Sequence, residues 1–149
     1  MTIPEILQRY RRVAMVGLSA NPMRPSHFVA IYLLHNGFDV TPVNPREPSI
    51  LGRTSYASLA DVPGPLEIVD VFRDPSALPG IASESVAAGA KVLWMQLGIV
   101  NQEAADSARH AGLEVVMDRC LKIEHARHAG GLSLMGLHSG LITARQRKR

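Results

Sequence analysis

Residues 12–45 read RVAMVGLSANPMRPSHFVAIYLLHNGFDVTPVNP, and this stretch decides the fold. Residues 13–16 are an apolar run with β-branched members, typical of a strand buried in a parallel sheet, and Gly17 ends the run. Residues 18–24 are rich in Ser, Asn and Pro, which indicates a loop. Residues 38–43 form a second apolar run and predict a second strand. A helix between the loop and this strand would complete a βαβ unit of ordinary size.

The segment between the loop and the second strand carries the signals of a helix. Pro25 suits a first helical position, and Asn36 with Gly37 is typical of a helix end. The apolar residues between them recur at helical spacing: Phe28, Ile31 and Leu34, with Val29, Ala30 and Leu33 beside them. The loop and the start of such a helix present free N–H groups and the positive end of the helix dipole. We therefore expect an anion such as phosphate to bind there.

The loop lacks the two common phosphate-binding motifs. The dinucleotide motif G-x-G-x-x-G would need glycines where Ser19, Asn21 and Arg24 stand, and the sequence has no Gly-Lys-Ser or Gly-Lys-Thr of a P-loop. A tight turn that binds no ligand stays open as the alternative at this point.

The rest of the chain alternates predicted strands and helices. Further strands are predicted at residues 67–72, 91–96 and 113–117, a short edge strand at 52–56, helices at 3–11, 76–88 and 102–112, and a helical turn at 58–62. The alternation predicts a single α/β domain with a Rossmann-like, doubly wound parallel sheet. With the expected strand order 3-2-1-4-5-6, the loops after Gly17, Phe72 and Gln96 border one crevice.

Composition narrows the class of protein. A chain of 149 residues with 46% hydrophobic and 19% charged residues fits one ordinary globular domain. The net charge is +3, and much of it lies in residues 145–149, so nucleic-acid binding is not indicated. The single cysteine excludes an internal disulfide, and no signal peptide or membrane-spanning apolar run is visible, so we expect a cytoplasmic protein without membrane contact.

Four stretches in the same order resemble the small CoA-binding proteins, single-domain relatives of the CoA-binding domain that opens the α subunit of succinyl-CoA synthetase. They are GLSANPMRPSHFVAIYLLHNGFDVTPVNP at residues 17–45, DVFR at 70–73, KVLWMQLG at 91–98 and MDRCLKIEH at 117–125. The resemblance implies a Rossmann-like domain that binds coenzyme A or an acyl-CoA. We expect this domain to span residues 1–128 and a C-terminal extension with a basic tail to span residues 129–149.

The resemblance and the fold class place the ligand at the same loops. The candidate cofactor-binding residues are Gly17, Ser19, Ala20, Asn21, Arg24, Pro25, Ser26, Asn44, Pro45, Arg46, Phe72, Arg73, Gln96 and Gly98. Ser19, Asn21 and Ser26 can donate hydrogen bonds and Arg24 supplies positive charge, although we expect loop N–H groups to contribute most. By resemblance, the backbone of Phe72 and Arg73 borders the adenine or the pantetheine.

The residues after the second strand argue against NAD. NAD-binding domains keep an acidic residue there for the ribose hydroxyls, whereas this chain has Arg46 and no acid before Glu47. Arg46 would suit the ribose phosphate that CoA and NADP both carry, and a solvated loop charge is the alternative.

The sequence shows no catalytic constellation, so we predict no catalytic residue. The six histidines are scattered, and His125 and His128 have metal-like spacing without the further ligands of a zinc site. Trp94 is expected in the core. A thiolate of Cys120 near Arg119 and Lys122 could form a mixed disulfide with CoA, and an inert, partly buried thiol is the alternative.

Two main functions follow from the sequence. The first is a non-enzymatic module that binds CoA or acyl-CoA at the C-terminal ends of the parallel strands, where a partner protein uses the bound cofactor. Association with a synthetase-like partner or into a homo-oligomer stays open. The alternative is a small NADP-dependent or other nucleotide-using enzyme. An adaptor with a vestigial pocket is the third interpretation. The synthetase's phosphohistidine domain is absent from the sequence, so ligase activity is not implied.

Overall fold

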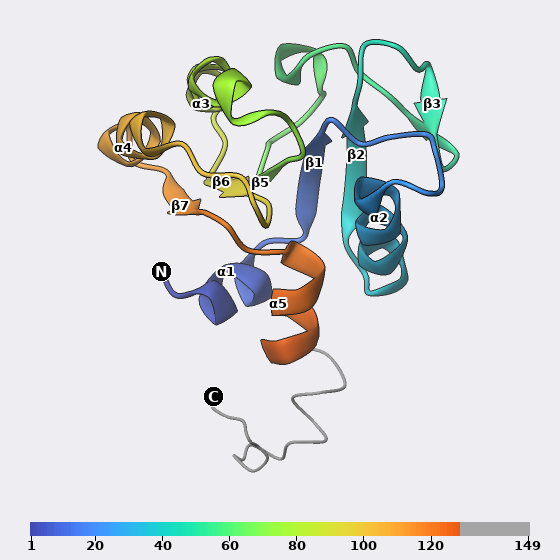
Figure 1. Ribbon diagram of the computed structural model, residues 1–149, viewed down its shortest axis with the longest axis horizontal. Helices are drawn as coiled ribbons and strands as arrows, with labels where there is room; N and C mark the ends of the chain where they lie inside the picture. Colours follow the sequence, from blue (N-terminus) through green and yellow to red (C-terminus); the bar gives the residue numbers. More distant parts are fainter. Residues whose placement is uncertain (129–149) are drawn as a thin grey trace.

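The apolar run at residues 13–16 forms the centre of a five-stranded sheet in the computed structural model, which describes residues 1–128 (Figure 1). In β1 (Arg12–Val16) the last four residues are all buried, as expected for a strand covered on both faces. The strand order is β2-β1-β5-β6-β7, and every pairing is parallel. The other strands are β2 (Asp39–Val43), β5 (Ile68–Val71), β6 (Val92–Met95) and β7 (Glu114–Val116).

Helices cover both faces of this sheet (Figure 1). On one face α3 (Leu78–Ala87) and α4 (Gln102–His110) pack on a core of apolar side chains, and the buried Ser85 hydroxyl donates to the Ile81 carbonyl oxygen within α3. On the other face lie α1 (Ile3–Arg9), α2 (Pro25–His35) and α5 (Leu121–His128), and their core contains Trp94, which is fully buried as predicted. The predicted α/β class and doubly wound arrangement are therefore confirmed.

The βαβ unit begins and ends where the sequence predicts. Pro25 opens α2, Asn36 caps it, and Gly37 follows with a positive φ of 84°. The structure buries only one of the two apolar rows: Val29 and Ala30 face the core with Leu33, whereas Phe28 is 52% exposed. The sequence alone does not show which row is buried, because the helix itself carries apolar residues on all of its sides.

The predicted edge strand at residues 52–56 forms only in part. The chain folds back into a two-stranded antiparallel hairpin, β3 (Ser49–Ile50) with β4 (Arg53–Thr54), and Tyr56 then makes an isolated parallel bridge with Val43 at the edge of the main sheet. The reason is the turn at Leu51 and Gly52, which both have positive φ and reverse the chain at once. The expected order 3-2-1-4-5-6 is therefore replaced by 2-1-3-4-5 for the parallel strands in chain order, and the switch point between β1 and β5 is unchanged.

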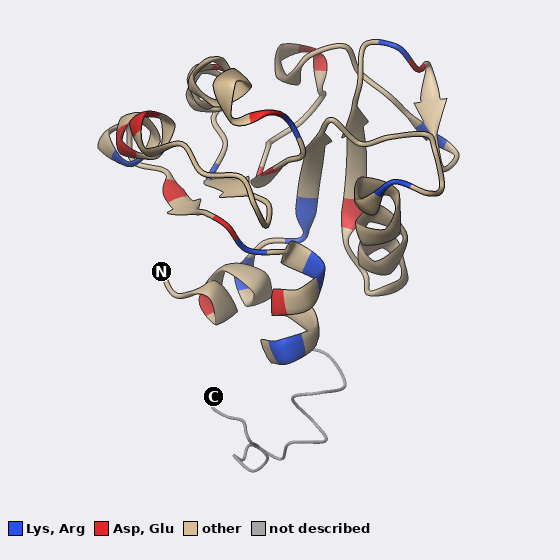
Figure 2. Cartoon of the chain, viewed as in Figure 1, with Lys and Arg blue, Asp and Glu red and all other residues tan. Residues whose placement is uncertain are grey.

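Shorter elements complete the described chain. The predicted turn at residues 58–62 is the 3-10 helix η1 (Leu59–Asp61), and η2 (Pro75–Ala77) precedes α3. Acidic and basic residues are interspersed over loops and helices (Figure 2). None of the helices formed by residues 1–128 has the length and apolarity needed to cross a membrane. The predicted extension at residues 129–149, with its basic tail, lies outside the described residues.

Candidate functional site

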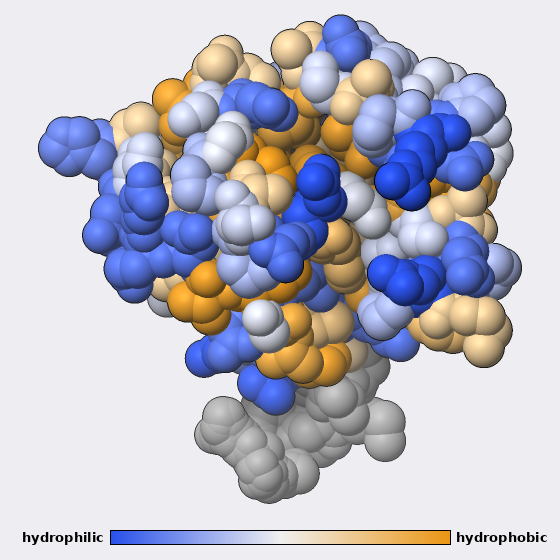
Figure 3. Space-filling view, turned by 45° about the horizontal axis from the view of Figure 1, so that its top comes forward, coloured by the Kyte–Doolittle hydropathy of each residue, from blue (hydrophilic) through white to orange (hydrophobic). Residues whose placement is uncertain are grey.

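A cavity of about 480 Å³ opens at the carboxyl ends of β1, β5 and β6, where the strand order reverses. It is lined by Gly17, Ser19, Arg24, Pro25, Ser26, Val29, Phe72, Arg73, Gln96, Leu97, Ile99, Cys120 and Ile123. Figure 3 brings this edge of the sheet forward and shows hydrophobic residues set back between hydrophilic ones. The cavity has two ends of different chemistry, which we call the phosphate end (Gly17, Ser19, Arg24, Ser26 and Arg73) and the α5 end (Gln96, Leu97, Ile99, Cys120 and Ile123).

The phosphate end depends on the close approach of two loops at Gly17. This residue has a φ of 90°, and a Cβ placed on it would lie 2.5 Å from the carbonyl oxygen of Phe72. Only glycine therefore lets the loop after β1 pass so close to the loop after β5. The side chain of Arg73 packs against the same spot, with its Cδ 3.0 Å from the hypothetical Cβ.

Hydrogen bonds within the loop hold it in one shape. Ser19 N–H donates to Ser26 Oγ at 3.0 Å, and Asn21 N–H donates to Ser19 Oγ at 3.0 Å. Met23 N–H donates to Asn21 Oδ1 at 2.9 Å, and His27 Nδ1 lies 2.8 Å from the Ser19 carbonyl oxygen. The side chains that the sequence offered as ligand donors are thus largely used as acceptors inside the loop.

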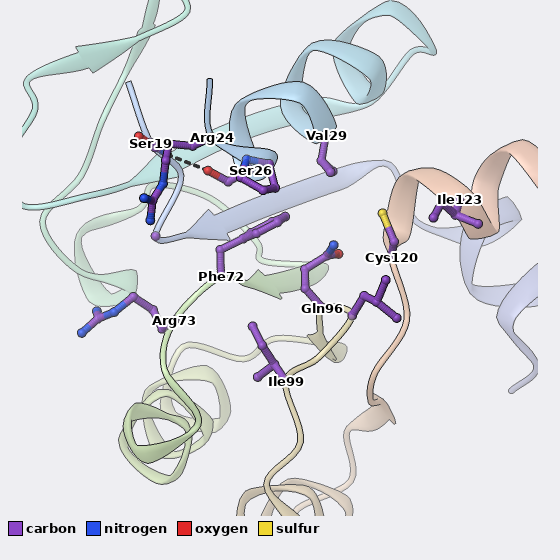
Figure 4. A pocket seen from close by; sticks show the side chains of 13 residues that line it. Ser19, Arg24, Ser26, Val29, Phe72, Arg73, Gln96, Ile99, Cys120 and Ile123 are labelled. Carbon is purple, nitrogen blue, oxygen red and sulfur yellow. Dashed lines mark hydrogen bonds between the residues drawn. The ribbon is translucent and has the colours of Figure 1, made fainter. Parts of the chain in front are cut away.

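One backbone donor and two guanidinium groups remain available at this end. In the loop and first helical turn, the N–H groups of Ala20 and Ser26 have no acceptor within residues 1–128, and of these two residues Ser26 lines the cavity. Arg24 and Arg73 are exposed and form no ion pair with any other described residue. Figure 4 shows both arginines on the side of the cavity away from Cys120 and Ile123. Two exposed guanidinium groups without an ion-pair partner, one of them at a helix N-terminus, favour a multiply charged anion, although Arg73 lies near the Asp74 carboxylate and adds to the hydrogen bonds from Ser76 in lowering the pKa of that group.

The α5 end is fixed by long-range hydrogen bonds from the segment before α5. Leu121 N–H donates to Gln96 Oε1 at 3.1 Å, and Trp94 Nε1–H donates to the Arg119 carbonyl oxygen at 2.8 Å. Trp94 and Gln96 lie on or just after β6, Arg119 lies just before α5, and Leu121 is the first residue of α5. The thiol of Cys120 is therefore held at the wall of the cavity.

The basic neighbours of Cys120 do not surround its sulfur as the sequence suggested. Arg119 donates from Nη1 to the Asp118 carbonyl oxygen at 2.9 Å. The Lys122 ammonium lies 5.8 Å from the ring centroid of Tyr32. The expected activation of the thiol by these two charges is therefore not supported by their positions.

Packing of α5 against α2 depends on a buried histidine. The Tyr32 hydroxyl and His125 Nδ1 are 2.8 Å apart, and the His125 ring meets the Phe38 ring edge-on at 5.2 Å between centroids. Burial, with a smaller contribution from Arg11, lowers the pKa of His125, and burial raises the pKa of Tyr32. His125 is consequently neutral in the folded protein at neutral pH.

Asp70 is an unusual residue beneath the cavity. Asp70 lies on β5, two residues before Phe72. Because side chains alternate between the two faces along a strand, the side chains of Asp70 and Phe72 lie on the same face of the sheet. Its two carboxyl oxygens are fully buried, and neither has a hydrogen-bond partner within the described chain. Burial raises the pKa of Asp70 well above its ordinary value, which favours the neutral acid.

The structure brings together eight of the fourteen candidate residues. Those lining the cavity are Gly17, Ser19, Arg24, Pro25, Ser26, Phe72, Arg73 and Gln96. Those outside its lining are Ala20, Asn21, Asn44, Pro45, Arg46 and Gly98. Asn44 instead ties two loops by donating from Nδ2 to the Leu18 carbonyl oxygen at 3.0 Å. The Gly98 N–H donates to Asp118 Oδ1 at 2.7 Å, so the expected backbone contact is occupied by a side chain.

Sequence reasoning missed the apolar part of the lining. Val29, Leu97, Ile99 and Ile123 were not candidates, although Leu97 and Ile99 follow a strand whose loop was expected at the crevice. The signal that could have found these two was the run of apolar residues continuing past the end of that strand, where a turn is normally polar. Val29 and Ile123 gave no such signal because their position depends on helix orientation.

Metal binding finds no support in the described residues. No cluster of three or more His, Cys, Asp or Glu side chains within residues 1–128 is arranged to hold an ion. His125 contacts Tyr32, whereas His128 Nε2 lies 3.4 Å from Glu124 Oε1. The two histidines with metal-like spacing thus contact different residues and do not face a shared ion.

Comparison with known proteins identifies relatives along nearly the whole described chain. Residues 11–126 match the family described as the CoA binding domain. Uncharacterized protein YneT of Bacillus subtilis (strain 168) is 44% identical over 124 residues, which are 83% of this chain and 92% of that protein. A hypothetical protein from Pyrococcus horikoshii OT3 is 43% identical with a TM-score of 0.84, over 86% of this chain and 90% of that chain.

A larger protein shares the fold alone. The apo form of dinucleotide forming acetyl-coenzyme A synthetase 1 from Ca. Korarchaeum cryptofilum is 21% identical, with a TM-score of 0.69. The match covers 76% of this chain and 27% of that chain, so the fold here corresponds to one part of that protein.

Proposed function

The chain belongs to the CoA-binding domain family, as its sequence motifs predicted, and from this premise we propose that it is a non-enzymatic module that binds CoA or an acyl-CoA in the cavity at the switch point. The observation that carries the proposal is the polarity of that cavity. One end offers two guanidinium groups without ion pairs and the free N–H group of Ser26, whereas the other end carries no charged side chain and is mostly apolar. CoA has the same asymmetry, because its phosphates lie at one end and its pantetheine arm at the other.

The parts of CoA have distinct places in this proposal. The pyrophosphate lies between Arg24 and Arg73 and accepts from the Ser26 N–H at the start of α2. Phe72 lies between the two ends and packs against the arm as it leaves the phosphates. The arm then runs past Gln96 toward Cys120, over apolar side chains that have no charge to desolvate.

The adenosine with its 3′-phosphate lies outside the cavity, over the loop after β2. Arg46 is exposed there, and its N–H donates to Asn44 Oδ1 at 2.8 Å, which holds the loop that carries the guanidinium. Asn44 itself is tied to the loop after β1. This link holds the backbone of Arg46 in place relative to the phosphate end, and the exposed side chain extends from there to the ribose phosphate.

The absence of an acid–base pair favours binding over catalysis. The titratable side chains that line the cavity in the described chain are Arg24, Arg73 and Cys120. Neither guanidinium can act as a proton acceptor at neutral pH. We therefore propose that a partner protein, and not this domain, uses the bound cofactor.

Calorimetric titration with CoA, acetyl-CoA, 3′-dephospho-CoA and NADP at one salt concentration tests the proposal. We expect about micromolar binding of CoA and acetyl-CoA and about tenfold weaker binding without the 3′-phosphate, as for one lost charge-assisted contact. The Arg46→Ala variant should remove that difference and leave 3′-dephospho-CoA binding unchanged. Tight NADP binding without CoA binding would favour the nucleotide-using enzyme, and no binding at all would favour the adaptor with a vestigial pocket.

A further inference from the structure

A buried hydrogen-bond donor faces the cavity at its α5 end. Gln96 is only 4% exposed, yet it lines the cavity. The Leu121 N–H donates to Gln96 Oε1, so the amide is oriented with Nε2 directed away from α5. Within residues 1–128 this Nε2 has no acceptor, and it is not among the atoms fully buried from solvent. A ligand that enters the cavity therefore meets a donor that is already oriented and still unpaired.

The thiol of Cys120 lies beside this donor. Figure 4 shows the Gln96 amide rising between the Phe72 ring and Cys120, with the sulfur turned toward the side of Val29. Cys120 directly precedes α5, and its carbonyl oxygen accepts from the Glu124 N–H at 2.9 Å in the first helical turn. The sulfur thus lies at the positive end of a helix dipole, which favours negative charge on a neighbouring group.

A pantetheine arm has the chemistry that this pair would recognise. Its amide carbonyls accept hydrogen bonds, and it ends in a thiol. We propose that Gln96 donates from Nε2 to a pantetheine carbonyl and that Cys120 forms a mixed disulfide with CoA. The inference rests on the proposed function, because phosphates bound at Arg24 and Arg73 direct the arm toward Gln96.

The reaction is a thiol–disulfide exchange with CoA disulfide as the oxidant. The Cys120 thiolate attacks one sulfur of CoA disulfide, and the bond between Sγ and that sulfur forms as the CoA disulfide bond breaks. The second CoA leaves as a thiolate with the bonding electron pair and takes up the proton that Cys120 lost. One disulfide is thus consumed and one is formed, with no other reductant or oxidant.

Intact-mass spectrometry of the full chain with CoA disulfide tests this step. Cys120 is the only cysteine in the chain, so any disulfide adduct is assigned without digestion. We expect one CoA to be added per chain, and dithiothreitol should release it. The adduct should form about tenfold or more faster than the adduct with glutathione disulfide, because bound phosphates raise the local concentration of CoA disulfide. Cys120→Ser should give no adduct. Equal rates for the two disulfides, or no adduct from CoA disulfide, would overturn the proposal.

The Gln96→Glu variant tests the donor separately from the fold. Glutamate keeps an oxygen for the Leu121 N–H and replaces the donor by a second acceptor, so we expect CoA to bind about tenfold more weakly, as for one hydrogen bond turned into a repulsion. Adenosine 3′,5′-bisphosphate lacks the pantetheine arm, and its affinity should not change. Equal weakening of both ligands, or no weakening of CoA, would contradict the assigned contact.

These experiments separate the two proposals. If CoA binds the wild-type protein in the titration but CoA disulfide forms no adduct, the inference about Cys120 is wrong and the proposed function stands. If neither CoA nor adenosine 3′,5′-bisphosphate binds, the proposed function is wrong, and the inference falls with it.

Discussion

The two ends of the cavity are assembled in different ways. Four of the five residues of the phosphate end come from one loop and the first turn of α2, in which Ser19, Asn21 and Ser26 hold one another, and the fifth, Arg73, comes from the loop after β5. The α5 end joins residues 25 positions apart, through the hydrogen bond from Leu121 to Gln96. The structure of a local segment can be predicted from its own residues. A surface made by two distant segments also depends on how a whole helix packs.

Replacing Gly17 should damage the phosphate end most. Gly17→Ala combines a positive φ with a Cβ 2.5 Å from a backbone oxygen, so we expect a loss of about 3 kcal/mol in the free energy of unfolding. Gly37→Ala is the matched control, because Gly37 has a φ of 84° but nothing within 4 Å of a Cβ, and about 1 kcal/mol is expected. Urea unfolding measures both. Equal losses would show that the contact with Phe72 is unimportant.

Removing both cavity arginines should weaken CoA binding without unfolding the domain. For Arg24→Ala with Arg73→Ala we expect about 100-fold weaker binding, since a hydrogen bond to a charged group contributes about 1.5 kcal/mol or more. The salt dependence of the affinity should fall as well, because exposed charges are screened.

Arg109→Ala on the last turn of α4, which is not among the residues that line the cavity, is the control and should bind CoA as the wild type does. Titrations at two salt concentrations measure the effect. Unchanged affinity in the double variant would contradict the place given to the phosphates.

Asp70 lies beneath Phe72, between the two ends of the cavity. Its replacement should change the stability of the whole domain and not the structure of one end alone. The native pKa of Asp70 is raised, so its contribution to stability is complete below the unfolded value of 3.8 and is lost as the pH rises toward the native value. Asp70→Asn removes this loss, and we expect about 2 kcal/mol higher stability at pH 8.

The control for Asp70 is an aspartate in the opposite situation. Asp39 is half exposed and accepts from Arg53 Nη1 at 2.7 Å, so Asp39→Asn should cost a few tenths of a kcal/mol, about what an exposed ion pair contributes. Thermal unfolding at pH 5 and pH 8 distinguishes the two variants. The stability of the wild type should fall relative to that of Asp70→Asn between pH 5 and pH 8. If it does not fall, the Asp70 carboxyl is solvated or paired in solution.

The smallest effect should come from loosening α5. Tyr32→Phe removes the hydrogen bond to His125 and should cost about 1 kcal/mol, with a few-fold loss of CoA affinity and no loss for adenosine 3′,5′-bisphosphate. Acid should act in the same way. The native pKa of His125 is lowered, so the unfolded state binds more protons below about 6.5 and stability falls with pH from there. Titrations of both ligands from pH 7.5 to 5.5 test this, and parallel losses would contradict a role confined to the α5 end.

The sequence predicted most of the fold because the deciding signals are local. The run at residues 13–16, Pro25 and the pair Asn36–Gly37 each specify a backbone conformation through their own chemistry. The hairpin at β3 and β4 was missed because two residues with positive φ, one of them Leu51, reverse the chain without a recognisable turn motif.

The site residues also fall into two groups, those that local sequence predicted and those that depend on the packing of helices. Gly17, Arg24 and Ser26 were recognisable because a loop before a helix N-terminus is a known anion site. Val29 and Ile123 were not, because which side of α2 and α5 faces the cavity is decided by contacts such as Tyr32 with His125, which no pattern in one segment encodes.

Backbone amide chemical shifts recorded by NMR, with CoA and with adenosine 3′,5′-bisphosphate, test the central claim most directly. We predict that the bisphosphate shifts amides of residues 17–27, 44–47 and 72–74, and that CoA shifts these and also residues 96–99 and 120–123. CoA shifts confined to the polar cleft lined by Val40, Thr41, residues 51–54 and Tyr56, or identical shifts for both ligands, would contradict the account.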